Sequence, residues 1–248
     1  MASESLNGIV LSYSDYRDND RILTLLTIEK GRVDCKVRNC RKPTAPFLAC
    51  SQLFVYGEYT IFTTKQHTTL NSCEIKETFF PIREDPDRFM IGSVVLKLSL
   101  SAAESDVQNQ SLFSLLYYSL SYLAYSEVNP NDLLCGFLVK YLDILGYRPT
   151  LTNCAVCHKD VRNDDVLFYS PSAGGTVCVS CPHGGSPVNK TALEAIRRMI
   201  LLSDQDLKRI KMPESLQKDV LTLLNSSLEE ILGADDKSVQ YLYKMIDC

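Results

Sequence analysis

The segment Ile22-Leu-Thr-Leu-Leu-Thr-Ile-Glu-Lys-Gly-Arg-Val-Asp-Cys-Lys-Val-Arg-Asn39 predicts two β-strands joined by a turn, in a chain of 248 residues. Residues 22–27 form an apolar run with strand-favouring residues, and Glu29-Lys30-Gly31 predicts the turn that follows. Residues 32–39 alternate with the two-residue period of a half-buried strand. One face of this strand holds Val33, Cys35 and Val37, whereas Asp34 shares the other face with Arg32 and Lys36.

Further strands are predicted on both sides of this pair. Residues 6–12 are apolar and β-branched, and the polar cluster 14–20 after them predicts a turn. Residues 53–62 alternate as well, although both faces of that strand carry apolar side chains. About five short strands within some 75 residues are typical of a small antiparallel β-barrel. We therefore predict a barrel domain over residues 1–80.

Beyond residue 80 the apolar residues recur with the 3.6-residue period of helices. Helices are predicted over 87–103, 112–123, 134–145 and 239–246, from Thr191, and after Pro213. Thr191 and Glu194 have the spacing of a capping box, which predicts an N-terminal cap at Thr191. The stretch from about 150 to 188 interrupts the helical pattern with glycine, proline and cysteine. The predicted fold class is α+β, a barrel followed by a helical domain over 81–248 with this stretch as an insertion.

Four of the ten cysteines form two pairs, Cys154-Ala-Val-Cys157 and Cys178-Val-Ser-Cys181. Zinc prefers four tetrahedral nitrogen or sulfur ligands, and each CxxC turn presents two sulfurs to one ion. We predict one structural Zn²⁺ per chain, because four thiolates leave no open coordination position for catalysis. The alternatives are four unligated thiols, one redox-active CxxC pair, or a substitute ligand, His158 or His183. The six other cysteines are predicted to be ordinary thiols: Cys35, Cys40, Cys50, Cys73, Cys135 and Cys248.

Composition and motifs argue against several classes of function. The chain has 45% hydrophobic and 23% charged residues, as soluble globular proteins do, and no apolar run long enough for a membrane span. Residues 1–7 lack the features of a secretory signal, which predicts a cytoplasmic protein. Asp15–Asp20 lacks the glycine and glutamate of an EF-hand, and no zinc-deaminase signature or phosphate-binding glycine loop is present. We therefore predict that the protein is not an enzyme.

Residues 30–42 hold six basic side chains and one acid, although the net charge of the whole chain is −4. On a small barrel such a face is where the phosphates of single-stranded nucleic acid would run. Aromatic residues that could stack on bases are nearby: Tyr13, Tyr16, Phe47, Phe54 and Tyr56. The alternative is a solvated strand face beside core aromatics. The six candidate nucleic-acid-contacting residues are Lys30, Arg32, Lys36, Arg38, Arg41 and Lys42.

Several motifs together resemble the family of the bacterial recombination mediator RecO. Gly8-Ile-Val-Leu11, Asp15-Tyr-Arg-Asp-Asn-Asp-Arg-Ile-Leu-Thr-Leu-Leu-Thr27, Gly31 and Cys40-Arg-Lys-Pro43 look like its N-terminus. Leu142-Asp-Ile-Leu-Gly-Tyr-Arg-Pro149, the two CxxC pairs and Gly174-Gly175 are similar to its helical domain with a zinc module. The resemblance departs at Cys40, where the family usually has another small residue, and at His158, where it usually has glycine.

The resemblance implies an N-terminal OB-fold and a role in DNA repair and homologous recombination without catalysis. It implies binding of single- and double-stranded DNA, annealing of complementary strands, and a partner, RecR. It also implies help in loading RecA onto DNA coated with single-strand-binding protein. The C-terminal tail of single-strand-binding protein is the implied contact, and the implied location is the cytoplasm, at the nucleoid. Among the family's sites, the basic motif carries over to Lys36, Arg38, Arg41 and Lys42, with Lys30 and Arg32 as weaker candidates. The rival hypotheses are a zinc-stabilised adaptor that does not touch DNA and a redox enzyme that uses one CxxC pair.

Overall fold

The computed structural model describes residues 2–42, 44–64, 67–181 and 185–247. The predictions for His183 and Cys248 lie outside these residues. Contacts divide the chain into two compact units, residues 1–126 and 127–248. The last strand of the barrel ends at Glu77 and the first helix begins at Pro81, close to the predicted domain limit. Three helices after that limit nevertheless belong to the same compact unit as the barrel.

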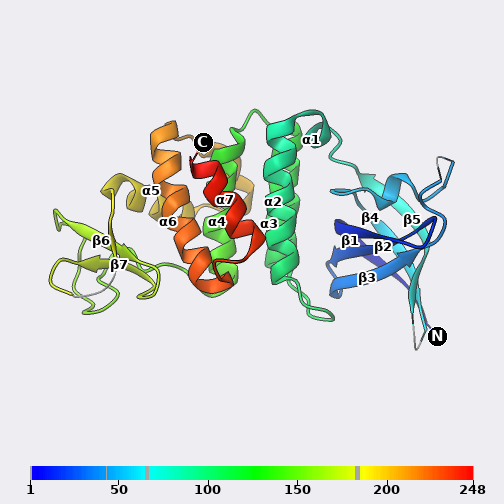
Figure 1. Cartoon of the computed structure of the whole chain (residues 1–248), viewed down its shortest axis with the longest axis horizontal. Helices are drawn as coiled ribbons and strands as arrows, with labels where there is room; N and C mark the ends of the chain where they lie inside the picture. Colours follow the sequence, from blue (N-terminus) through cyan, green and yellow to red (C-terminus); the bar gives the residue numbers. More distant parts are fainter. Residues whose placement is uncertain (1, 43, 65–66, 182–184, 248) are drawn as a thin grey trace. The chain divides into compact units, whose positions relative to one another are not determined.

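Five strands close into a barrel in the order β1-β2-β3-β5-β4 (Figure 1). Their bounds are β1 Ala2–Tyr16, β2 Asp20–Thr27, β3 Gly31–Val37, β4 Tyr56–Thr63 and β5 Thr68–Glu77. The pairs β1–β2, β1–β4, β2–β3 and β4–β5 are antiparallel. The strands β3 and β5 pair in parallel, with Lys36 opposite Thr69. This arrangement confirms the barrel that the alternating pattern predicted.

The interior of the barrel is filled by the apolar faces of its strands. Cys35 and Val37 are fully buried, as the alternation predicted, while Val33 is only partly buried. The buried Tyr59 donates a hydrogen bond of 3.0 Å from its hydroxyl to the carbonyl of Cys50. Cys50 belongs to the short 3₁₀ helix η1 (Ala49–Ser51), so this bond ties the long β3–β4 connection to the core.

The turn between β1 and β2 is shorter than the sequence suggested. The polar residues 14–16 continue β1, with Ser14 opposite Ile22 and Tyr16 opposite Asp20. Polarity predicted a turn there, but these side chains lie on the solvent side of a two-stranded ribbon, where polar residues are favoured. The turn itself comprises only residues 17–19, and Arg17 has a φ of +55°.

Three helices complete the first unit: α1 (Pro81–Glu84), α2 (Pro86–Ala102) and α3 (Gln110–Tyr125). The carboxylate of Asp85 caps α2 by accepting hydrogen bonds from the backbone N–H groups of Asp87 and Arg88. The α2–α3 connection lies against the β2–β3 turn, because the N–H of Arg32 donates to the carbonyl of Glu104 over 2.9 Å. Gly31, with a φ of +63°, allows this approach, since a Cβ there would lie 2.0 Å from the carbonyl oxygen of Val107.

Within its described residues, the second unit contains four α-helices, a 3₁₀ helix and a small sheet (Figure 1). The elements are α4 Pro130–Ile144, β6 Leu167–Ser170, β7 Gly175–Cys178, β8 Ser186–Pro187, α5 Lys190–Leu201, the 3₁₀ helix η2 Asp204–Arg209, α6 Glu214–Leu232 and α7 Lys237–Asp247. The predicted cap of α5 was wrong: the cap is Asn189, whose side chain accepts a hydrogen bond from the backbone N–H of Thr191, and it lies two residues before the predicted position. Within the described residues, no helix has both the length and the apolar character of a membrane span.

Candidate functional site

The two cysteine pairs converge in the second unit. The sulfur atoms of Cys154, Cys157, Cys178 and Cys181 all lie within 4.8 Å of one another. The Sγ–Sγ distances are 3.8 Å for Cys154–Cys181, 3.7 Å for Cys157–Cys178 and 3.6 Å for Cys178–Cys181. An ion about 2.3 Å from each of four tetrahedral sulfurs would hold them about 3.8 Å apart. The cluster therefore has the dimensions of a four-thiolate metal site, and it could hold a metal ion.

The backbone around the cluster favours thiolate at Cys154. Burial opposes ionisation of this thiol, but hydrogen bonds from the backbone N–H groups of Cys157, Cys178 and Val156 outweigh it and lower its pKa to about 6. For Cys181, burial and hydrogen bonding with Cys178 raise the pKa to about 12. Neighbouring thiolates repel one another, and a divalent cation between them would relieve that repulsion. The donor set thus fits a cation-filled centre better than a set of free thiols.

The first CxxC turn is closed by His158, which has a φ of +61°. Few non-glycine residues adopt this left-handed conformation, although histidine does so more readily than most. Glycine, the residue usual at this position in the family that the sequence resembles, would adopt it without strain. The N–H of His158 donates to the carbonyl of Cys154 over 2.9 Å, so the turn closes with histidine in place. His158 is not part of the described cluster of ligand atoms.

Backbone bonds fix the second CxxC turn beside the first. The strand β7 ends at Cys178, and the carbonyl of Thr176 in this strand accepts from the N–H of Ala155 over 2.8 Å. The N–H of Thr176 donates to the carbonyl of Thr150 over 2.8 Å. Gly175 permits this contact, because a Cβ there would lie 2.2 Å from the Thr150 oxygen. Strand pairing therefore brings together ligands that are more than twenty residues apart in the chain.

The six predicted DNA-contacting residues separate into two groups along β3. Lys36, Arg38, Arg41 and Lys42 lie at or beyond the C-terminal end of β3, beside the β1–β2 turn; we name these four and Arg17 of that turn the cationic end. The N–H of Arg41 donates to the carbonyl of Asn19, and its guanidinium donates to that of Asp18. Lys30 and Arg32 lie at the N-terminal end of β3, a strand about 20 Å long.

Carboxylates partner most of these cations. Four ion pairs are formed: Lys30–Glu4 at 2.7 Å, Arg32–Asp34 at 3.3 Å, Lys36–Asp20 at 2.9 Å and Arg41–Asp15 at 3.4 Å. Asp20 also accepts from the backbone N–H of Asn39, and this bond and the ammonium of Lys36 lower its pKa. Arg38 and Lys42 are exposed, and neither side chain has a hydrogen-bond or ion-pair partner within the part of the chain that the structure describes. These two are therefore the most available cations of the six.

The aromatic candidates have different environments. Phe54 is fully buried, and Tyr56 packs edge-on against Phe113 and Tyr117, so both are structural. The ring of Tyr13 lies under the guanidinium of Arg21, 3.9 Å from its centroid. Tyr16 has Lys36 Nζ at 4.7 Å and Arg17 at 5.2 Å from its ring centroid.

Two residues of this surface were missing from the predicted sites. Arg17 was passed over because it stands outside the basic run 30–42, in a turn that looked acidic. Phe62 stands in the strand predicted over 53–62, in which both faces carry apolar side chains. Strand pairing, which carries each of them toward β3, is not visible in either segment alone.

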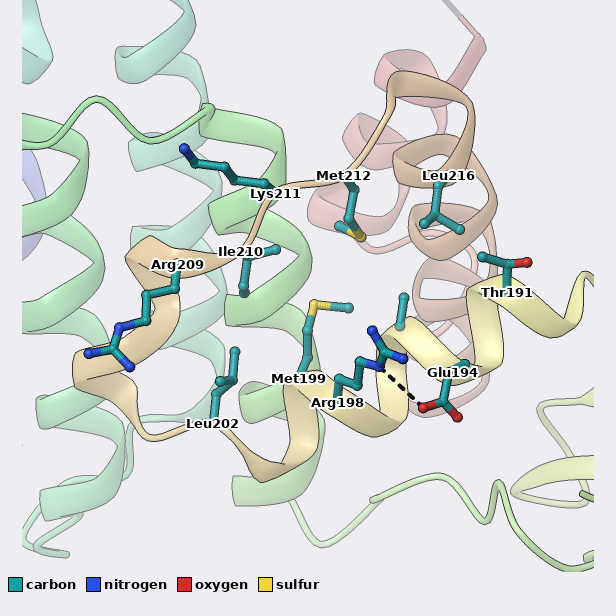
Figure 2. A pocket seen from close by; sticks show the side chains of 11 residues that line it. Thr191, Glu194, Arg198, Met199, Leu202, Arg209, Ile210, Lys211, Met212 and Leu216 are labelled. Atoms are coloured by element: carbon teal, nitrogen blue, oxygen red, sulfur yellow. Dashed lines mark hydrogen bonds and ion pairs between the residues drawn. The ribbon is translucent and has the colours of Figure 1, made fainter.

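A separate hollow of about 310 Å³ lies in the second unit between α5, η2 and the start of α6 (Figure 2). Its floor is apolar, with Met199, Ile210 and Met212, and its rim is basic. Three basic residues, Arg198, Arg209 and Lys211, line the hollow. Arg198 is paired with Glu194 and Arg209 with Asp206. Arg197 points elsewhere and donates to the carbonyl of Leu151.

Comparison with known proteins matches both halves of the chain to one family. The profile "Recombination protein O N terminal" matches residues 1–79, and "Recombination protein O C terminal" matches residues 83–240. The DNA repair protein RecO of Symbiobacterium thermophilum is 31% identical over 86% of this chain and 84% of its own length. The DNA repair protein RecO of Bacillus mycoides is 30% identical over 98% of this chain and 97% of its own length. The DNA repair protein RecO of Caldicellulosiruptor saccharolyticus is 27% identical over 94% of this chain and 95% of its own length.

Proposed function

This chain belongs to the RecO family of DNA repair and recombination proteins, and from this premise we propose that it is a mediator that binds DNA without catalysing a reaction. In this role it anneals complementary single strands. Together with RecR, it assists the loading of RecA onto DNA coated with single-strand-binding protein. The protein works in the cytoplasm at the nucleoid, on both single- and double-stranded DNA.

The observation that carries the proposal is the cationic end of the barrel. Five basic side chains from two neighbouring turns converge there, and Arg38 and Lys42 are exposed without a described partner. A cation that is already paired must exchange its carboxylate for a phosphate, whereas an unpaired one gains a charge-assisted contact outright. Arg38 and Lys42 are therefore the principal phosphate contacts, with Lys36 and Arg41 in support. Lys30 and Arg32 are secondary contacts at the far end of β3.

Phosphate neutralisation accounts for both binding and annealing. Each basic side chain that contacts a phosphate releases condensed counterions, so the affinity falls as salt rises. Four contacts to a single strand give a slope of about −3 for log affinity against log salt. Two strands whose charge is reduced on one surface repel each other less and can pair faster.

The metal centre has a structural role in this proposal. We assign it one Zn²⁺ per chain, held by Cys154, Cys157, Cys178 and Cys181, since zinc matches the donor set and four thiolates exclude a substrate. The ion holds the two CxxC turns and the β6–β7 hairpin together. It plays no part in chemistry on DNA.

The hollow of Figure 2 is the surface we propose for the C-terminal tail of single-strand-binding protein. That tail is acidic, so it requires a basic rim beside an apolar floor, and Lys211 on the rim has no described ion-pair partner. With the variant Lys211→Glu, we expect at least 10-fold weaker binding of a fluorescent tail peptide, because one attractive charge becomes repulsive. Lys244→Glu, at an exposed position of α7, is the charge-matched control. Equal binding by both variants would refute this placement.

The DNA proposal is tested by fluorescence anisotropy with labelled single-stranded and duplex DNA at about 50 and 200 mM salt. The variant Arg38→Glu/Lys42→Glu is expected to lose binding, because it reverses the two unpaired cations. The matched control, Lys237→Glu/Lys244→Glu, changes the net charge equally in the other compact unit and should bind nearly as the wild type does. Absence of wild-type binding at low salt would refute the proposal and favour a zinc-stabilised adaptor that does not bind DNA. The four ion pairs of Lys30, Arg32, Lys36 and Arg41 are also consistent with that role.

A further inference from the structure

A polar groove crosses the outside of the barrel where β3 meets β5. Two hollows of about 460 and 360 Å³ adjoin there, and both are lined by Arg38, His67 and Thr69. Tyr16 lines the first hollow and Phe62 the second. Beneath them, β3 and β5 share the pairing of Lys36 with Thr69. The groove therefore begins at the cationic end and continues onto β4 and β5.

Phe62 is an unusual side chain for this surface. It lies on the outer face of β4 and is 38% exposed, and its neighbours on the adjacent strands are the small residues Ser3 and Thr69. Two other exposed aromatic residues of the barrel, Tyr13 and Tyr16, have a cation against the ring. No ring or cation contact involves Phe62 within the residues that the structure describes. Its ring is thus open to an incoming planar group.

The groups around Phe62 suit an unpaired nucleotide. An aromatic ring stacks on the face of any base, and an adjacent cation holds the phosphate. Arg38 lines the same hollow as Phe62, and Asn71 and Thr69 add side-chain groups that can donate to or accept from a base edge. A base inside a duplex is stacked on its neighbours and cannot reach this ring, whereas an unpaired base can.

We propose that Phe62 is a strand-discriminating residue, which stacks on an unpaired base in this groove and gives the protein a preference for single strands over duplex. The inference rests on the proposed DNA binding and deepens it, because the phosphate contacts alone do not distinguish the two forms. Stacking of one base on one aromatic residue corresponds to about a 5- to 100-fold gain in affinity.

The test uses the absence of tryptophan from this chain. The variant Phe62→Trp places a single tryptophan in the groove, and Ile75→Trp places one at an equally exposed apolar position of β5 that lines neither hollow. We expect oligo-dT to quench the emission of Phe62→Trp, and a duplex of equal length to leave it nearly unchanged. Emission of Ile75→Trp should respond to neither DNA.

Anisotropy of Phe62→Ala provides the second measurement. Single-strand affinity should fall about 5- to 100-fold while duplex affinity stays within about 2-fold, with Ile75→Ala as the control. For Phe62→Trp, DNA binding without quenching or equal quenching by both DNAs would overturn the role of Phe62. An equal loss of affinity for both DNAs in Phe62→Ala would do the same. Each of these outcomes would leave the proposed DNA binding standing. Failure of the wild type to bind either DNA would instead overturn both.

Discussion

The barrel and the metal module, residues 150–188, are both built from short strands but stabilised in different ways. Strands of the barrel have seven to fifteen residues and enclose a continuous apolar interior. Those of the module have four residues or fewer, and the buried apolar side chains among its described residues, beside two of the cysteines, are Leu151, Val161, Leu167, Tyr169 and Val177. A region this small needs a metal ion or another cross-link to fold. The comparison predicts that removing the ion proposed for the four cysteines unfolds one region and spares the other.

Removing the metal should have the largest effect and test this contrast most directly. Structural zinc contributes roughly 10–16 kcal/mol of apparent binding free energy in small zinc domains, so Cys154→Ser/Cys178→Ser should unfold residues 150–188. Hydrogen exchange should rise across the module and stay unchanged in β1–β5, and metal analysis should show loss of the ion. Cys73→Ser, which changes a thiol of the barrel, is the control. Loss of protection in the barrel would contradict the comparison.

A cavity in the barrel should destabilise the barrel and leave the metal module unchanged. Ile61 is fully buried, and Ile61→Ala should lower the free energy of unfolding of the first unit by about 2–5 kcal/mol. Urea unfolding followed by circular dichroism measures this change, and the metal content should stay at that of the wild type. Ile75→Ala, at an exposed position, should change stability by about 0.5 kcal/mol or less. A fall in metal content on Ile61→Ala would show that the regions are coupled.

A matched pair of buried tyrosines compares the two regions at finer scale. The hydroxyl of Tyr59 donates to the carbonyl of Cys50 in the barrel, and that of Tyr169 lies 2.7 Å from Ser227 Oγ on α6. Each phenylalanine replacement removes a buried hydroxyl and its hydrogen bonding, so each should cost about 1 kcal/mol in its own region. Hydrogen exchange can assign the loss to a region, and Tyr147→Phe, which is exposed, should cause none. If either replacement lowered hydrogen-exchange protection equally in the barrel and the module, the two regions would not be independent.

Asp20 provides the smallest effect, a dependence of the cationic end on pH. The hydrogen bond from the N–H of Asn39 and the ion pair with Lys36 lower the pKa of Asp20 below its value in the unfolded chain. Its stabilising contribution is therefore present above the unfolded pKa and is lost as pH falls through the lower, folded pKa. We expect the protection of the 38–42 amides, corrected for the intrinsic pH dependence of exchange, to fall in acid, and Asp20→Asn to remove that dependence. An identical pH profile in the variant would exclude Asp20 as the cause.

The sequence predicted best those features that depend on local spacing. Two CxxC pairs were enough to predict the four-sulfur cluster, and the alternation around Cys35 predicted which face of β3 is buried. The helix from residue 191 was also expected, but its cap was assigned to Thr191, because a capping box and a single Asn cap are hard to distinguish when both residues are present.

Features that depend on pairing between strands were not predicted. Lys30 meets Glu4 and Arg41 meets Asp15, in each case a carboxylate from a segment more than twenty residues away. The basic run therefore looked more cationic in the sequence than it is in the folded barrel. The separation of Lys30 and Arg32 from the other four candidates has the same origin, since it follows from the length of β3.

The bonds that hold the 38–42 turn have a consequence for the thermodynamics of association. Arg41 is fixed by the carbonyls of Asp18 and Asn19, and the rest of the β3–β4 connection is tied to the interior through Tyr59. The conformational entropy of this segment is thus lost on folding rather than on complex formation. Calorimetry of DNA binding should therefore show a favourable entropy from released counterions that loop ordering does not cancel. A preorganised surface of this kind also favours rapid capture, because no rearrangement precedes the first contact.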